Sequence, residues 1–232
     1  MSYELITDID RTVLAWFNGS SSLFLDQLVC GLTSPWTWIP LYLVLLWLVI
    51  KNSETTQQMM LIIGIAVLCL LLSDGVTDGI VKPLVKRWRP IYDPAVRDTI
   101  DAVPGVVETR YGFFSAHAAN TFSIALYLCL IVRNRTFTLT VMAWSLINCY
   151  TRLYLGVHYP GDVLVGLCWG AIVGTGCWLL YRHLSRKFSP EIRYVSSQYT
   201  STGYGLSDIS VVVLVFTLVL GYAVIRAVVI PL

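Results

Sequence analysis

Hydrophobic residues gather in long runs along the chain, separated by short polar segments. Six runs are present, at 35–50, 58–80, 115–133, 137–155, 160–183 and 208–231. Each run has about 16–24 residues, and an α-helix needs about 20 apolar residues to cross the hydrocarbon core of a bilayer. Trp36 and Trp38 at one end of the first run, and Trp47 near the other, suit the interfacial belt where tryptophan is enriched. The pattern predicts an all-α bundle of about six transmembrane helices.

The N-terminal segment follows a different pattern. Apolar positions recur at helical spacing between acidic residues in 4–17, and the pattern resumes at Phe24 after a break at 19–22. Neither piece is long enough to span a bilayer, so we expect two amphipathic helices that lie in the interface. The acidic start, with Glu4 and Asp8, differs from the basic leader of a cleavable signal peptide.

These patterns predict one membrane-embedded domain over 1–232. We expect interfacial helices at 1–34, a core at 35–183, a cytoplasmic loop at 184–207 and the last transmembrane helix at 208–232.

The basic residues of the connections predict the orientation. Six spans place the two termini, the 81–114 loop and the 152–160 turn on one side. The connections on the other side hold an excess of basic residues over Glu54 and Glu191, namely Lys51, Arg133, Arg135, Arg182, Arg186, Lys187 and Arg193. Because positive loops stay in the cytoplasm, the first side should face the periplasm or exterior of a bacterial inner membrane.

Composition agrees with a membrane protein. Hydrophobic residues make up 56% of the chain and charged residues only 13%, against about 25% charged in a soluble domain. The net charge of +2 is too small to indicate a nucleic-acid partner. The six cysteines show no metal-ligand spacing, so we interpret them as small apolar side chains. Nothing in the sequence indicates an oligomeric state.

A basic patch follows the second apolar run, and it reads Lys82-Pro83-Leu84-Val85-Lys86-Arg87-Trp88-Arg89-Pro90. If the helix continues past Pro83, Lys82 and Arg89 lie two turns apart on one face. Two aligned cations at a membrane boundary are well placed to bind an anion. The alternative is a juxtamembrane cluster that contacts lipid headgroups.

A second patch opens the third apolar run, and it reads Phe114-Ser115-Ala116-His117. Ser115 is a good N-cap, and the free backbone N–H groups of a helix start form an anion site. His117 then lies in the first turn of this helix. A single histidine here could instead be an interfacial anchor.

The third patch runs from Thr151 to Asp162. Arg152 ends the fourth apolar run, and Pro160 suits the first turn of the next helix. His158 therefore precedes a helix start, and Asp162 lies in its first turn. A carboxylate there can orient the imidazole and leave its other nitrogen free to attack. An ordinary capping pair is the alternative.

All three patches fall on one side of a six-span bundle, and two of the three histidines lie there at helix starts. Ionisable residues at membrane-embedded helix ends are costly and indicate function. Asp74 and Asp78 share a helix face with Lys82, and we expect them to be its ion partners. His183 lies on the other side, and we interpret it as a surface residue.

Together the motifs Lys-x6-Arg-Pro, Ser-x-His and Arg-x5-His-x3-Asp resemble those of the type 2 phosphatidic acid phosphatase superfamily. The resemblance runs from Lys82 to Asp162. Phe114 and Ala116 replace the proline and glycine usual in that family, and Thr151 replaces a serine. We expect the chemistry to survive, with Ala116 changing the phosphate cradle slightly and Phe114 narrowing the mouth of the site.

The resemblance implies a role for each motif residue. His158 would attack phosphorus to give a phosphohistidine, His117 would protonate the leaving oxygen, and Asp162 would orient His158. Four residues would hold the phosphate, namely Lys82, Arg89, Ser115 and Arg152. No metal or other cofactor is implied, and the loop acids show no two-metal spacing.

The expected substrate is a membrane lipid phosphate, since a site at a membrane boundary suits an amphiphile. A loose N-terminal likeness to small bacterial members, at Phe17-Asn18-Gly19, favours undecaprenyl diphosphate. Phosphatidylglycerol phosphate, phosphatidic acid and the phosphates of lipid A are the alternatives. We expect the lipid tail to pass sideways between spans, along aromatic side chains that could equally form an interfacial belt, namely Trp88, Tyr92, Tyr111, Phe113 and Phe114.

Two other functions are open from the sequence. A lipid transporter or an inactive lipid-binding relative would fit the altered tetrad and the many spans. A vanadate-dependent haloperoxidase shares the anion-binding constellation, but those relatives are soluble and this chain is not.

Overall fold

The structure, a computed structural model, describes residues 3–103, 105–186 and 196–229, with the side chains of 3–6 excepted. Within these ranges every regular element is helical and no strand is formed. The longer helices are α1 (Tyr3–Phe17), α2 (Leu23–Thr33), α3 (Ile39–Asn52), α4 (Thr56–Val76), α6 (Ala116–Val132), α7 (Arg135–Tyr154), α8 (Pro160–Ser185) and α9 (Leu206–Val229). The short ones are α5 (Lys82–Val85), the 3-10 turns η1 (Pro35–Trp38), η3 (Pro90–Tyr92) and η4 (Arg97–Thr99), and the π-helical turn η2 (Thr77–Val81).

Each predicted span coincides with a helix, but the helices differ in length and polarity. Of the described helices, three are long and apolar enough to cross a membrane, namely Thr56–Val85, Pro160–Ser185 and Leu206–Val229. The pair α2 and η1–α3, bent by 67°, can make a fourth span, whereas α6 is apolar but shorter. The chain is therefore an integral membrane protein whose described part is all-helical, with three or four helices of spanning length. The count of six spans stays a prediction.

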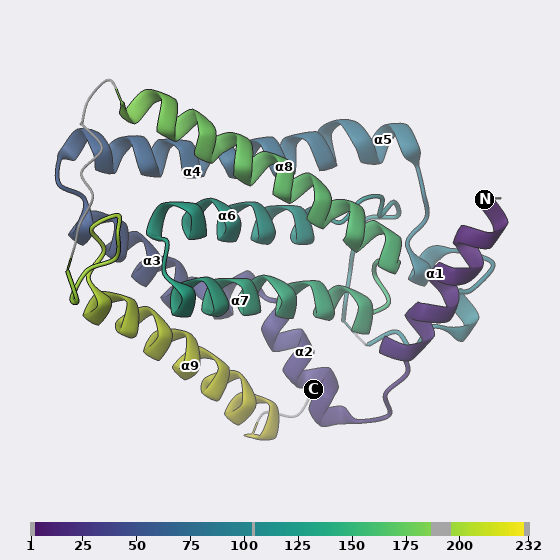
Figure 1. Cartoon of the computed structure of the whole chain (residues 1–232). Helices are drawn as coiled ribbons and strands as arrows, with labels where there is room; N and C mark the ends of the chain where they lie inside the picture. The colour runs from purple at the N-terminus through teal and green to yellow at the C-terminus, as the bar shows by residue number, and fades with distance from the viewer. Residues whose placement is uncertain (1–2, 104, 187–195, 230–232) are drawn as a thin grey trace.

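Helix α6 lies inside the bundle. It packs against α4, α7 and α8, and Figure 1 shows it between α8 and α7. Its neighbour α7 buries polar side chains, among them Ser145 and Asn148, that would be costly against lipid. Because these two helices contact protein rather than lipid over much of their surface, they do not need the continuous apolar character of α4 or α9.

The two helices that deliver the second and third motifs approach each other unusually closely. Three glycines of α8, Gly166, Gly170 and Gly174, face the backbone of α6. A Cβ atom at Gly170 would lie 2.8 Å from the carbonyl oxygen of Ala119, closer than a van der Waals contact. Small residues at this spacing let helix backbones touch, as in GxxxG pairs within membranes. The interface fixes the start of α6 relative to the start of α8.

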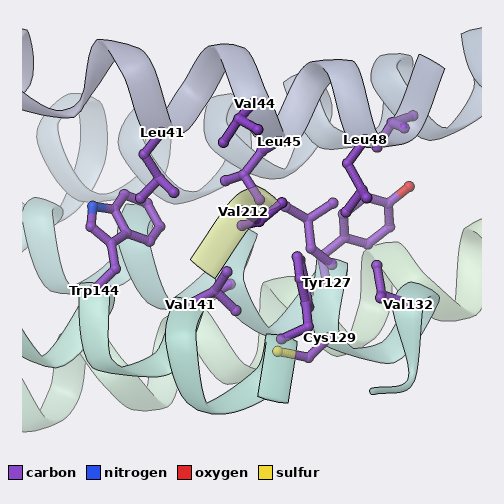
Figure 2. Close-up of a cluster of buried hydrophobic side chains, with 14 of the residues drawn as sticks. Leu41, Val44, Leu45, Leu48, Tyr127, Cys129, Val132, Val141, Trp144 and Val212 are labelled. Carbon is purple, nitrogen blue, oxygen red and sulfur yellow. The ribbon is translucent and has the colours of Figure 1, made fainter. Parts of the chain in front are cut away.

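The largest hydrophobic core lies toward the other end of the bundle. Figure 2 shows side chains of α3, α6, α7 and α9 meeting there, including Leu48, Tyr127 and Val212. The Tyr127 hydroxyl donates to the carbonyl oxygen of Ile62 at 3.1 Å, so this buried polar atom is satisfied. Beside it, Lys51 forms an ion pair of 2.7 Å with Asp208.

The N-terminal segment forms two helices where two were expected. Helix α1 packs against α7 and α8, and α2 packs against α7 and α9. Their expected position in the membrane interface stays a prediction. Of the basic residues used for orientation, Lys187 and Arg193 lie outside the described residues, as does Glu191. His183 is exposed, as expected for a surface residue.

Candidate active site

Lys82 and Arg89 meet at one cavity, but not by the geometry expected. The predicted continuous helix through Arg89 is wrong, because α5 ends at Val85 and Lys86 adopts a left-handed conformation with φ of 51°. The Lys86 N–H donates to the Lys82 carbonyl and closes the last turn. The chain then reverses in extended form, which returns Arg89 to the same cavity as Lys82.

This cavity has a volume of about 450 Å³ and two unlike ends. One end is polar and is lined by Asp74, Asp78, Lys82, Arg89, Glu108, His117, Asn120 and His158. The other end is more apolar and includes Pro35, Tyr42, Leu70, Ile124 and Trp144. A lipid phosphate likewise has a polar, charged end and an apolar end, so it matches the cavity.

The polar end contains two acids that precede Lys82 by four and eight residues, Asp78 and Asp74. Asp78 forms an ion pair of 2.5 Å with Lys82, which confirms the expected partnership. Asp74 instead accepts a hydrogen bond of 2.9 Å from Asn120 of α6.

His158 lies between a cation and a carboxylate, and it is 1% exposed. Arg89 Nη1 is 2.7 Å from its Nε2, and Asp162 Oδ2 is 3.6 Å from its Nδ1. A guanidinium can only donate, so Nε2 is the acceptor and the proton of the neutral ring lies on Nδ1. The imidazole is thus oriented with its Nε2 lone pair toward Arg89, whereas its Nδ1 lies 3.6 Å from the Asp162 carboxylate, beyond hydrogen-bond distance.

Burial sets the protonation state of this imidazole. Loss of solvent lowers the pKa of His158 well below 6.5, and the nearby Arg89 lowers this pKa further. Burial also lowers the pKa of the Arg89 guanidinium, although the Glu108 carboxylate opposes this shift. His158 is therefore neutral at physiological pH, while a guanidinium, with an ordinary pKa of 12.5, stays charged.

At the start of α6, Ser115 packs in the protein interior and His117 lines the cavity. Ser115 is the N-cap, as predicted, and its Oγ accepts from the Ala118 N–H at 3.4 Å. Its own N–H donates to the Asp162 carbonyl at 3.0 Å, which ties the two motifs together. Ser115 is fully buried, whereas Ala116 and His117 line the cavity. The expected contact of the Ser115 hydroxyl with phosphate stays a prediction.

Arg87 is the first functional residue that sequence reasoning missed. Its guanidinium joins Asp162 at 2.7 Å to Asp10 of α1 at 2.6 Å and stacks on the Tyr159 ring, with a centroid distance of 4.4 Å. Asp10 also accepts from the Gly161 N–H at 2.7 Å. Asp162, the carboxylate beside His158, is therefore held by Arg87, which lies outside the third patch. The only local signal was its place among the four cations of the first basic patch.

Glu108 is the second missed residue, and it lies among the predicted phosphate ligands. Its Oε1 is 3.0 Å from Arg152 Nη1, and its Oε2 is 3.2 Å from Arg89 Nη2. Both guanidinium side chains are 3% exposed and the Glu108 side chain is 23% exposed. One carboxylate thus bridges the two arginines at the wall of the cavity.

The aromatic side chains expected to guide the lipid lie elsewhere. Trp88 packs on Tyr111 at a centroid distance of 5.8 Å, and Phe114 packs on Trp169 at 6.4 Å. Phe114 is 5% exposed, so it is a core residue and does not narrow the mouth of the site. The apolar wall of the cavity comes from other segments, among them η1, α3 and α7.

Comparison with known proteins assigns this arrangement to a family. The sequence profile of the PAP2 superfamily matches residues 59–186. A lipid A 4′-phosphatase of Bacteroides thetaiotaomicron is 36% identical over 77% of this chain and 78% of its own. A lipid A 4′-phosphatase of Porphyromonas gingivalis is 30% identical over 77% of this chain and 75% of its own.

A solved structure agrees at the level of the fold. The crystal structure of a transmembrane PAP2-type phosphatidylglycerolphosphate phosphatase from Bacillus subtilis has a TM-score of 0.56 with this chain. It shares 20% identity, over 80% of this chain and 88% of that one. The chain belongs to the PAP2 superfamily and is a membrane lipid phosphatase.

Proposed function

We propose that His158 is the nucleophile of a phosphohistidine mechanism. The observation that carries the proposal is the orientation of this buried ring, with Nε2 facing Arg89 at 2.7 Å and Nδ1 on the side of Asp162. A neutral imidazole whose Nε2 lone pair faces cations can attack an anionic phosphoryl group once the Arg89 N–H has passed from Nε2 to a phosphoryl oxygen, because the cations neutralise the charge that would repel the nucleophile. Asp162 stabilises the positive ring that forms after attack.

The remaining motif residues serve the two halves of the reaction. Lys82, Arg89 and Arg152 hold the phosphoryl oxygens while Nε2 forms a bond to phosphorus and the ester oxygen leaves. A protonated His117, which lines the same cavity, gives that oxygen a proton. His117 then takes a proton from water, which attacks phosphorus, breaks the N–P bond and releases inorganic phosphate. Side-chain cations supply the charge stabilisation, so the proposal includes no metal.

The first candidate substrate is a lipid A phosphate. The two relatives of 30% identity or more named above are lipid A 4′-phosphatases, which favours this alternative over undecaprenyl diphosphate. Lipid A is a phosphorylated glycolipid, and the cavity wall offers Asp74, Asp78 and Asn120 as partners for sugar hydroxyls beside the cations. Undecaprenyl diphosphate, phosphatidylglycerol phosphate and phosphatidic acid are the competing substrates. The face of the membrane on which the site opens, expected to be periplasmic, is part of the same proposal.

A phosphate-release screen of purified protein in detergent tests both the chemistry and the substrate. The four lipids are compared with wild type, His158→Ala and His183→Ala, the last an exposed histidine as a matched control. We expect turnover of lipid A, retained in His183→Ala and in EDTA, and lost by about 10⁴-fold or more in His158→Ala. Activity of His158→Ala within tenfold of wild type would contradict the nucleophile. A rate that EDTA abolishes and Mg²⁺ restores would contradict the metal-free chemistry.

A further inference from the structure

The position of Glu108 poses a chemical question for any phosphate that enters the site. Its two oxygens are paired with the Nη atoms of Arg89 and Arg152, at 3.2 and 3.0 Å. The N–H groups of the two guanidinium groups hold the Glu108 carboxylate in the same way as they would hold the oxygens of a phosphoryl group. A phosphate can use these N–H groups only after the carboxylate has moved aside.

We propose that Glu108 is a specificity-determining residue that admits phosphomonoesters and keeps phosphodiesters out of the arginine pair. This inference rests on the proposed function, because it assumes that Arg89 and Arg152 bind the phosphoryl group of the substrate. A phosphodiester carries one negative charge, as does the carboxylate that it would have to replace. A phosphomonoester carries up to two, so its attraction to the two arginines is about double at equal distance.

The membrane gives this discrimination a purpose. Bulk phospholipids are phosphodiesters, and they surround a site at a membrane boundary in large excess over any phosphomonoester. Without a competing carboxylate, a buried pair of arginines would bind these headgroups and be inhibited by them. Glu108 offsets that attraction for a monoanion, whereas a dianion retains a net gain. Specificity here comes from raising the cost of the wrong ligand.

The surroundings of Glu108 allow the side chain to move while the arginines stay in place. Its backbone carbonyl accepts a hydrogen bond of 3.1 Å from the Tyr92 hydroxyl, which anchors the main chain. Arg89 keeps independent contacts, through Nε to the Thr109 carbonyl at 2.6 Å and Nη1 to the Val157 carbonyl at 3.0 Å. With a side chain 23% exposed, Glu108 can turn toward solvent without a change in the position of Arg89.

The test measures inhibition of phosphate release by short-chain phosphatidylglycerol, a phosphodiester with one negative charge. Glu108→Gln keeps the shape of the side chain and removes its charge. Asp98→Asn is the matched control, since Asp98 is a loop carboxylate with an 85% exposed side chain that pairs only weakly, at 3.4 Å, with Arg97. We expect the inhibition constant of phosphatidylglycerol to fall by about tenfold or more in Glu108→Gln, and to stay at the wild-type value in Asp98→Asn. Equal inhibition of all three proteins overturns the proposal.

Direct binding separates this inference from the proposed function. Purified wild type and Glu108→Gln are titrated with inorganic phosphate and with short-chain phosphatidylglycerol, followed by calorimetry. Tighter binding of the diester by the variant supports the role of Glu108 even if no lipid is hydrolysed, a result that would defeat the proposed function alone. Unchanged diester affinity overturns the inference even if lipid A is a good substrate.

A second variant keeps the test informative if Glu108→Gln does not fold. Glu108→Asp retains the charge, but one methylene fewer prevents its oxygens from reaching both arginines. We expect it to fold with one ion pair and to be inhibited by the diester more strongly than wild type. Wild-type inhibition in Glu108→Asp, with its thermal midpoint unchanged, would overturn the proposal.

Discussion

Two of the carboxylates at this site, Asp162 and Glu108, are held in different ways. Asp162 lies in the first turn of α8, is fully buried, and is fixed by Arg87 at 2.7 Å and by the Tyr159 N–H at 3.1 Å. Glu108 lies on the loop between the first two motifs, with its side chain 23% exposed. Asp162 is held by the partly exposed Arg87 and by a backbone N–H at the start of α8, whereas among the described residues the carboxylate of Glu108 pairs with the two arginines proposed to bind phosphate.

The difference separates a fixed part of the site from an exchangeable one. A carboxylate that orients a nucleophile has to keep its position through the reaction, which calls for several partners that do not themselves bind substrate. A carboxylate that competes with substrate has to leave, which calls for solvent access and for partners that the substrate can take over. Four changes would break or sharpen this division.

The largest effect is expected from Asp162→Asn. The amide would present an N–H group to His158 Nδ1 and favour the wrong tautomer, so kcat should fall by about 10³-fold or more with little change in KM. Single-turnover phosphate release measures this rate, with Asp98→Asn as the control. An equal fall of kcat in Glu108→Gln would erase the distinction between the two carboxylates.

Arg87→Ala should be the most damaging change to stability. The substitution leaves the buried carboxylates of Asp10 and Asp162 without the guanidinium that pairs with both. Breaking a buried ion pair costs about 3–5 kcal/mol of folding free energy. Thermal unfolding in detergent measures the loss. Arg97→Ala is the control, because its exposed pair with Asp98 should contribute less than about 1 kcal/mol. Similar losses for the two variants would show that the clamp on Asp162 does not stabilise the fold.

The glycine contact between α6 and α8 predicts opposite effects for two substitutions in one helix. Gly170→Ala places a Cβ 2.8 Å from the Ala119 carbonyl and should destabilise the protein by about 1–3 kcal/mol. Gly176→Ala meets nothing within 4 Å and should stabilise α8 by up to about 1 kcal/mol. Unfolding midpoints of the two variants measure the signs. An unchanged unfolding midpoint in Gly170→Ala would mean that the fixed part of the site tolerates a wider separation of α6 and α8.

The smallest effect is the pH dependence contributed by His158. Its pKa is below 6.5 in the folded protein and near 6.5 in the unfolded chain, so the unfolded state binds the proton first as pH falls. The stability gained from neutral burial is complete above pH 6.5 and is lost below it, by at most about 1.4 kcal/mol per pH unit. The stability of wild type should therefore fall more steeply between pH 6.5 and 5 than that of His158→Gln. Parallel curves would contradict a lowered pKa.

Local rules account for the parts of the site that the sequence predicted. Ser115 was identified as an N-cap, and Pro160 as the first residue of the next helix. Both signals act within a few residues of the chain. The pairing of Asp78 with Lys82 is another short-range contact, four residues apart in a helix. The presence of helices at all the apolar runs follows from the same kind of signal.

The parts that the sequence did not predict depend on contacts between distant segments. Arg87 and Asp10 are 77 residues apart, and their meeting depends on how α1 packs. Glu108 reaches Arg152 across 44 residues, from a loop with no periodic pattern. The turn at Lys86 was missed because helical spacing was extrapolated past Pro83, although a left-handed residue ends the helix there. Composition and periodicity carry no information on such pairings.

The hydrogen bond from Gly161 to Asp10 spans 151 residues, and it has a consequence for biosynthesis. Translation delivers α1 first, yet its partner at the start of α8 emerges only after most of the chain has been made. Until then Asp10 has no Gly161 to bind, and Asp162 does not exist to be clamped by Arg87. Long-range contacts of this kind form late in folding. A nascent chain halted before α8 should therefore carry all four proposed phosphate ligands, Lys82, Arg89, Ser115 and Arg152, and yet be unable to hydrolyse the lipids around it.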